Sequence, residues 1–231
     1  MLRFIPSKYT ATKYSASSWS NALVGLKWSA FRYECTASAG KRLSRARGAA
    51  AEAARFLPED ARLPWGWVEN RGLLRALEDR AWREPSFPAQ VASMRRLLRL
   101  CPDDPLGVRL HLLSMLLDAE QPGEAQALLE QYPEDVSVDW MFGRVLAHAQ
   151  LNQLQQAEAA FRLAHRRYPK VLAALTPERK SPPRGLDRSA VVVGSAEEAW
   201  LYRDEMRHLF VAVTGLLPFL EQVARRMRGG R

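Results

Sequence analysis

One stretch of the sequence decides the fold: QAEAAFRLAHRRYP, from Gln156 to Pro169. In it a small residue, Ala157, is followed by the aromatic Phe161 four positions later, by Ala164 at seven and by Pro169 at twelve. Ala157, Phe161 and Ala164 therefore share one face of a helix. Proline cannot continue a helix, so Pro169 predicts the end of one.

A similar amphipathic pattern recurs upstream, and a proline closes each cycle, at Pro102, Pro133 and Pro169. These prolines lie 31 and 36 residues apart, which brackets the period of about 34 residues that is typical of helix-turn-helix repeats. The copies differ in detail. The first lacks the small residue, and the second helix of the middle copy is about one turn short.

The Gln156–Pro169 stretch resembles the second helix of a tetratricopeptide repeat, in which the aromatic residue fills the gap to the next repeat. The junction from Cys101 to Arg109 resembles the turn between such repeats, with aspartate caps and Pro105 at the start of the next helix. The resemblance covers residues 65–175. It implies an all-α protein built as a short, right-handed stack of helical hairpins, an α-solenoid.

Around this body the composition predicts three further segments. Residues 1–48 hold one acidic residue, Glu34, and show no lasting period, so we expect a basic arm that is poorly ordered. A transit-like peptide, an incorrect start site, or aromatic residues that pack onto the body are the alternatives. Residues 49–175 form the repeat body, and residues 176–194 read as a proline-rich linker.

Residues 195–231 are expected to form capping helices and a basic tail. Ser195 with Glu198 three positions later has the order of a capping box, so a helix should begin there. Gly215 and Pro218 predict a break before a final helical turn or two. We assign this unit to covering the apolar face that the last repeat would otherwise expose to water.

The resemblance also implies a binding groove, because the first helices of tetratricopeptide repeats line the concave side of the stack. Polar and small residues follow a helical stripe on each predicted first helix. The candidate groove residues are Arg71, Arg75, Glu78, His111, Ser114, Asp118, Arg144 and His148. A solvated helix face predicts the same pattern. The lysine and asparagine clamp that some family members use for peptide carboxylates is not recognisable, so that activity is not transferred.

The net charge of +9 and the pI near 10.0 favour acidic partners. Basic residues gather outside the clearest repeat, and the candidate nucleic-acid contacts are Lys41, Arg42, Arg45, Arg47, Arg225, Arg226 and Arg228. A further group, from His165 to Lys170, lies at a helix end, where the helix dipole explains the cations.

Nothing in the sequence indicates catalysis. The four histidines have no metal-ligand spacing, and no phosphate-binding loop, nucleophile elbow or zinc-protease motif occurs, so we expect no enzyme, no metal and no cofactor. Two cysteines in unlike segments favour a reducing compartment, the cytoplasm. The longest apolar run, from Leu209 to Leu220, is too short to cross a membrane.

Two functions remain. The first is a non-catalytic protein–protein interaction module, an adaptor or a subunit of an assembly, that binds a peptide or helix of another protein in the groove. The second is nucleic-acid binding through the basic arm and the C-terminal tail. The sequence leaves the partner and the oligomeric state open.

Overall fold

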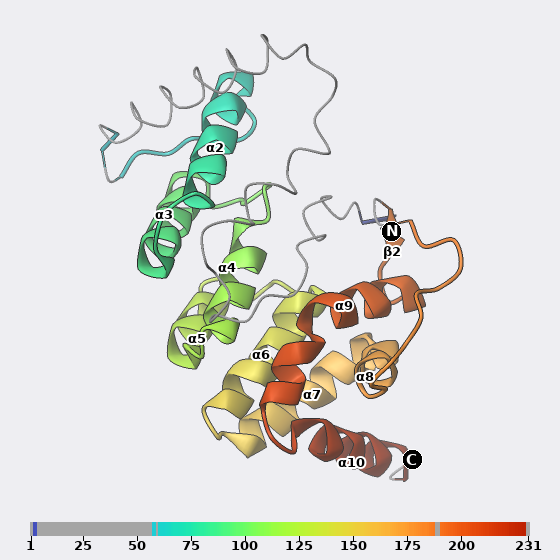
Figure 1. Ribbon diagram of the computed structural model, residues 1–231. Coiled ribbons are helices and arrows are strands. Elements are labelled where there is room, and N and C mark those ends of the chain that lie inside the picture. Colours follow the sequence, from blue (N-terminus) through green and yellow to red (C-terminus); the bar gives the residue numbers. More distant parts are fainter. Residues whose placement is uncertain (1, 4–56, 59, 188–189, 230–231) are drawn as a thin grey trace. The chain divides into compact units, whose positions relative to one another are not determined.

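The computed structural model describes residues 2–3, 57–58, 60–187 and 190–229, and of residues 2–3 it describes the backbone alone. The described part is helical apart from one short pairing of strands, so the all-α prediction is confirmed (Figure 1). Apart from residues 2–3, the predicted arm at residues 1–48 lies outside the described residues, and so do residues 49–56 at the start of the predicted repeat body. The described residues fall into two compact units, a first one that ends at Leu112 and a second one that runs from Leu113 to Gly229 and includes residues 2–3.

The first unit contains the hairpin of α2 (Val68–Ala81) and α3 (Phe87–Leu100). The two helices pack against each other, and Leu74, Ala81, Met94 and Leu97 are buried. Ser86 caps α3 by accepting a hydrogen bond from the Ala89 amide, with Pro88 in the first turn. Proline is tolerated at this position, because the amides of the first helical turn have no acceptor within the helix.

Next comes α4 (Val108–Asp118), which runs from the first unit into the second. The predicted aspartate cap is confirmed: Asp104 accepts hydrogen bonds from the amides of Val108 and Arg109, at 2.7 and 2.9 Å. The start at Pro105 is wrong. Residues 105–107 form a turn that ends at Gly107, whose φ of +70° suits glycine.

The second unit holds α5 (Pro122–Glu130), α6 (Val138–Gln150), α7 (Leu154–Arg167) and the short α8 (Pro169–Leu175). Nine residues make α5 shorter than the fourteen of α7, as the sequence indicated. Ala157, Phe161 and Ala164 are fully buried, which confirms the face predicted for α7. Pro169 both follows α7 and starts α8.

The last two helices are α9 (Ala196–Ala212) and α10 (Leu216–Gly229). The capping box is confirmed: the Ser195 hydroxyl accepts from the Glu198 amide at 3.0 Å, and the Glu198 carboxylate accepts from the Gly194 amide at 2.6 Å. The final helix is longer than predicted. Pro218 falls in its first turn and so removes no helical hydrogen bond.

Packing in the second unit joins helices that are distant in the sequence. Phe142 of α6 meets Phe161 of α7 and both Tyr202 and Phe210 of α9, with ring centroids 5.5 to 6.3 Å apart. Helix α9 also packs on α8, and α10 packs on α7 and α8 (Figure 1). A two-residue strand, β1 (Leu2–Arg3), pairs antiparallel with β2 (Val191–Val192).

Arg203 fastens α9 to the end of α8. Its guanidinium is buried and donates to the carbonyl oxygens of Ala174, Leu175, Pro177 and Glu178, at 2.6 to 3.3 Å. Arg207 adds a bond from Nε to the Leu175 carbonyl at 2.9 Å. The last carbonyls of a helix have no partner within the helix and carry partial negative charge, so a planar cation suits them.

Candidate nucleic-acid interface

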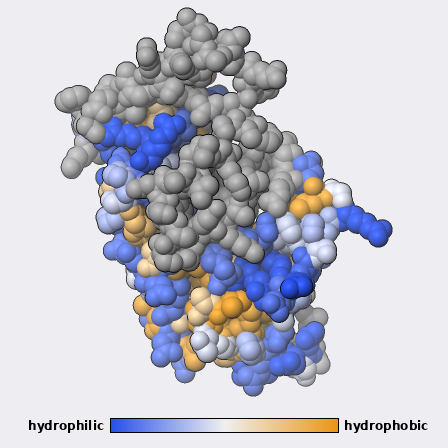
Figure 2. Space-filling view, viewed as in Figure 1, coloured by the Kyte–Doolittle hydropathy of each residue, from blue (hydrophilic) through white to orange (hydrophobic). Residues whose placement is uncertain are grey.

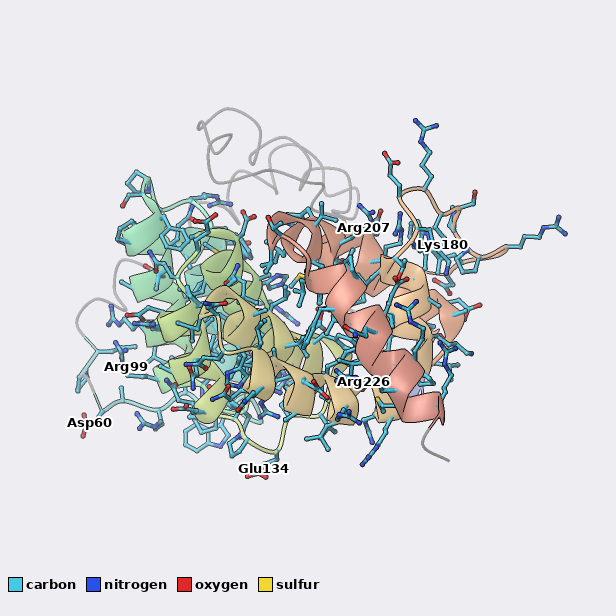
Figure 3. The ribbon with its side chains drawn as sticks, turned by 90° about the horizontal axis from the view of Figure 1, so that it is seen from below. Asp60, Arg99, Glu134, Lys180, Arg207 and Arg226 are labelled. Atoms are coloured by element: carbon cyan, nitrogen blue, oxygen red, sulfur yellow. The ribbon has the colours of Figure 1, made fainter. Side chains whose placement is uncertain are left out.

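Helices α7 and α10 are linked by a charged network with Glu158 at its centre. The Glu158 carboxylate accepts from Arg162 one turn further along α7, at 2.7 Å, and from Arg226 of α10, at 2.9 Å. The hydrogen bond from Arg162 and the charge of Arg226 lower the pKa of Glu158. One carboxylate thus holds two guanidinium groups near each other across the two helices. Figure 3 labels one of them, Arg226 of α10.

His165 lies further along α7 and is half-buried. Its ring stacks on Phe161 with centroids 5.2 Å apart, and Nδ1 is buried without a hydrogen-bond partner among the described residues. Burial lowers the pKa of His165, and the positive charge of Arg228 on α10 lowers it further. The imidazole therefore favours its neutral form, while Arg228 brings another charge to the same pair of helices.

These contacts define what we call the α7–α10 basic surface, made of Arg162, Arg166, Arg226 and Arg228. Arg166 belongs to it because it follows Arg162 by one helical turn. Arg166, Arg226 and Arg228 are exposed, whereas Arg162 is half-buried. Over the lower part of the view, Figure 2 shows hydrophilic residues interspersed with hydrophobic ones. Glu158 carries one negative charge and the four arginines carry four positive charges, so the surface has a net positive charge.

A family model described as Tcf25, transcriptional repressor TCF25, matches residues 53–197. The match covers well over half of the chain. The chain belongs to the Tcf25 family. No curated protein and no solved structure matches it.

The matched Tcf25 region runs from α2 to the beginning of α9, so it includes α7 but not α10. The basic surface thus combines one helix from the Tcf25 match with one that follows it. Within the described ranges, no helix has the length and apolar character needed to cross a membrane. Among the same residues, no three or more His, Cys, Asp or Glu side chains lie together in a way that could hold a metal ion.

The predicted groove residues fall in both units, and those of the first unit are Arg71, Arg75, Glu78 and His111. The guanidinium groups of Arg71 and Arg75 each lie over the Trp65 ring, 5.4 and 5.3 Å from its centroid. Glu78 is buried, and His111 meets Trp82 edge to face at 5.1 Å. Of these four residues, Arg75 is the one whose side chain is exposed. Arg71 is held further by a hydrogen bond that it donates to the Trp65 carbonyl at 2.9 Å.

In the second unit the candidates are Ser114, Asp118, Arg144 and His148. Arg144 donates to the Pro133 carbonyl at 3.2 Å, and His148 contacts the Gln153 side chain at 2.8 Å. Asp118 lies 3.2 Å from His208 of α9. These contacts explain the residues locally, and a common face for the two sets stays a prediction.

Two of the helix-to-helix turns have the same geometry. After α4 the Gln121 amide donates to the Leu116 carbonyl. After α6 the Gln153 amide donates to the His148 carbonyl, and donor and acceptor each lie 32 residues after their counterparts in the first turn. Glu120 and Asn152, at the same spacing, both have positive φ. The predicted groove stripes on α4 and α6 are 30 residues apart, two fewer than the turns. A shift of two residues rotates a position by about 200° around the helix axis. The turn register therefore pairs Ser114 with Leu146 and Asp118 with Gln150.

Sequence reasoning missed Arg162, Arg166 and Glu158 as parts of a surface. Arg166 had a sufficient local explanation in the helix dipole, and nothing in the sequence pairs α7 with α10. Of the predicted nucleic-acid contacts, Arg226 and Arg228 lie on the basic surface, and Arg225 is an exposed neighbour. The remaining contacts, Lys41, Arg42, Arg45 and Arg47, lie outside the described residues.

Proposed function

We propose that the protein is a non-catalytic regulator of transcription that binds nucleic acid through the α7–α10 basic surface. The family description supports a role in transcription. The observation that carries the proposal is the bridge from Arg162 and Arg226 to Glu158, which joins two helices into one positive surface. Such a role belongs in the nucleus, and we propose that compartment in place of the cytoplasm.

Contacts to phosphate groups explain how this surface works. Guanidinium groups match phosphate oxygens with two parallel hydrogen bonds, and neutralised phosphates release their counterions. Arg226 keeps half of its side chain exposed while Glu158 orients it, so it can reach a phosphate with little loss of side-chain entropy. The binding is therefore expected to depend on salt and to discriminate weakly between base sequences.

The proposed scaffold is a short stack of hairpins like that of tetratricopeptide repeats. Equivalent turns 32 residues apart support it, as do the small residues where helices approach. A Cβ placed on Gly143 of α6 would lie 2.7 Å from Leu113 of α4, which indicates close packing of successive first helices. On this proposal α9 and α10 cover the last hairpin.

Fluorescence anisotropy with a labelled DNA duplex and a labelled RNA, between 50 and 200 mM salt at about neutral pH, tests the nucleic-acid proposal. Arg226→Gln combined with Arg228→Gln should weaken binding and flatten the dependence of log Kd on log salt by about 0.9 for each lost contact to DNA. The matched control is Arg83→Gln with Arg99→Gln, which removes the same charge from two exposed sites. If both double variants lose the same amount of binding, the net charge of the protein, and not this surface, is responsible for the binding.

A protein partner is the second candidate. Trp67 and Val68 are each 67% exposed beside the pair of arginines that cover Trp65, and exposed apolar residues next to cations suit a protein contact. Affinity purification with and without nuclease separates the two candidates. Partners that survive nuclease and are lost with Arg75→Glu support the adaptor role, and partners that all disappear with nuclease contradict it.

A further inference from the structure

The loop between α8 and α9 contains the same short motif twice. Thr176-Pro177-Glu178-Arg179 and Ser181-Pro182-Pro183-Arg184 each have a hydroxyl residue, a proline directly after it and an arginine three positions on. Proline-directed serine/threonine kinases accept this pattern, because their substrate cleft takes an extended chain whose residue after the hydroxyl has no amide to satisfy. Neither copy serves the proposed function.

Ser181 has the geometry of an acceptor. It is exposed and lies outside the helices and strands of the described chain. The following Pro182 favours an extended backbone at Ser181, the conformation that a kinase cleft requires. Lys180 is anchored on one side, since its backbone carbonyl accepts from the Trp200 indole at 3.2 Å and its amine donates to the Ala173 carbonyl at 3.0 Å. The serine thus stands just beyond the fixed part of the loop.

Thr176 has the same motif and the opposite geometry. It is the C-terminal cap of α8 and has a helical backbone, with φ of −63° and ψ of −50°. Its hydroxyl donates to the Leu172 carbonyl at 3.0 Å, and the side chain is half-buried. The two residues that follow it, Pro177 and Glu178, are held by Arg203 through their carbonyl oxygens. An extended conformation at Thr176 would require release of this contact.

We propose that Ser181 is a phosphorylation site for a proline-directed serine/threonine kinase, and that the fold protects Thr176 from the same enzyme. In the reaction the Ser181 hydroxyl oxygen attacks the γ-phosphorus of ATP. The bond from that phosphorus to the β,γ-bridging oxygen breaks, ADP leaves, and the kinase's catalytic aspartate accepts the hydroxyl proton. The product is a phosphoserine between Lys180 and Pro182.

The phosphate has cationic neighbours on both sides. It adds about 1.5 to 2 negative charges at neutral pH, and Arg179, Lys180 and Arg184 lie within three residues of it. Charge-assisted hydrogen bonds to these residues compete with the bond from Lys180 to the Ala173 carbonyl. Phosphorylation therefore changes how the loop between α8 and α9 is held at the end of α8.

The experiment incubates the full chain with a recombinant cyclin-dependent kinase and magnesium ATP and locates phosphate by peptide mass spectrometry. Ser181 should be phosphorylated at least about tenfold faster than Thr176, and Ser181→Ala should remove nearly all incorporation. A synthetic peptide of residues 172–187 is the reference, because in it neither hydroxyl is held by the fold, and both should be modified at similar rates.

A second variant tests the protection directly. Arg203→Lys should raise the rate at Thr176 in the full chain, since one amine cannot hold all four carbonyl oxygens, while the rate at Ser181 stays the same. Equal rates at the two sites in the unmodified chain would overturn the protection by the fold. Absence of phosphate on Ser181, in the chain or in the peptide, would overturn the site itself.

Discussion

Gly143 of α6 lies so close to Leu113 of α4 that a Cβ on the glycine would fall 2.7 Å from Leu113 Cδ2. Both residues are buried, and Leu113 is 1% exposed. Leu113 therefore has little room to move away from an added Cβ. Glycine weakens a helix interior by about 1 kcal/mol, so its presence here is explained by the close approach of the two helices.

The first prediction is that Gly143→Val destabilises the fold by about 1 to 3 kcal/mol, because the added carbons overpack this crossing. The free energy of unfolding from urea titrations provides the measurement. Gly123→Val is the matched control, since a Cβ at Gly123 meets nothing within 4 Å. Two variants of equal stability would show that α4 and α6 are not in contact at this point.

The second prediction concerns Ala157, which is fully buried on α7. Ala157→Leu should cost about 1 to 3 kcal/mol of stability through overpacking, measured in the same titrations. The matched control is the exposed neighbour Gln156. Gln156→Leu should change stability by less than about 0.5 kcal/mol.

The third prediction concerns the contact of Arg203 with the end of α8. Arg203→Lys should lower stability by about 2 to 3 kcal/mol, because one ammonium group cannot reach all four carbonyl oxygens and some of them lose their donor. Arg207→Lys removes a single bond to Leu175 and should cost less. If the two variants are equally stable, the carbonyl oxygens are satisfied in another way, for example by water.

The fourth prediction is a loss of stability in mild acid due to His165. The pKa of His165 is lower in the folded protein than its ordinary value of 6.5, so between these two values the unfolded chain binds more protons. Stability from this residue is complete above about pH 6.5 and falls as the pH drops toward the folded pKa. Melting temperatures of the protein and of His165→Gln, measured from pH 7.5 to 5, should converge as the pH falls. Parallel curves would contradict a neutral, buried imidazole.

The sequence predicted the parts of the fold that depend on local chemistry. The faces of α7, the Asp104 cap and the Ser195 capping box all follow from residues a few positions apart. The start of α4 was wrong because Gly107 takes a positive φ after Pro105, a turn that the sequence permits without requiring. The length of α10 was underestimated because Pro218 was read as a break and lies in a first turn.

The candidate site was less predictable, for a physical reason. Arg162 and Arg226 meet at Glu158 although 64 residues separate the two arginines along the chain, and no local period encodes that pairing. Aligning α4 and α6 at their first residues gave a spacing of 30, whereas α6 has 13 residues and α4 has 11. Such a difference in helix length becomes visible only when the turns that follow the helices are compared.

Arg203 recognises backbone oxygen atoms, and every residue type carries them. Pro177 and Glu178 can therefore be replaced by other residues without loss of the atoms to which the guanidinium binds. The segment that follows α8 is thus held in place while its side chains remain free to vary between related proteins. Acceptor motifs for kinases can arise or disappear in such a segment during evolution at little cost to the stability of the fold.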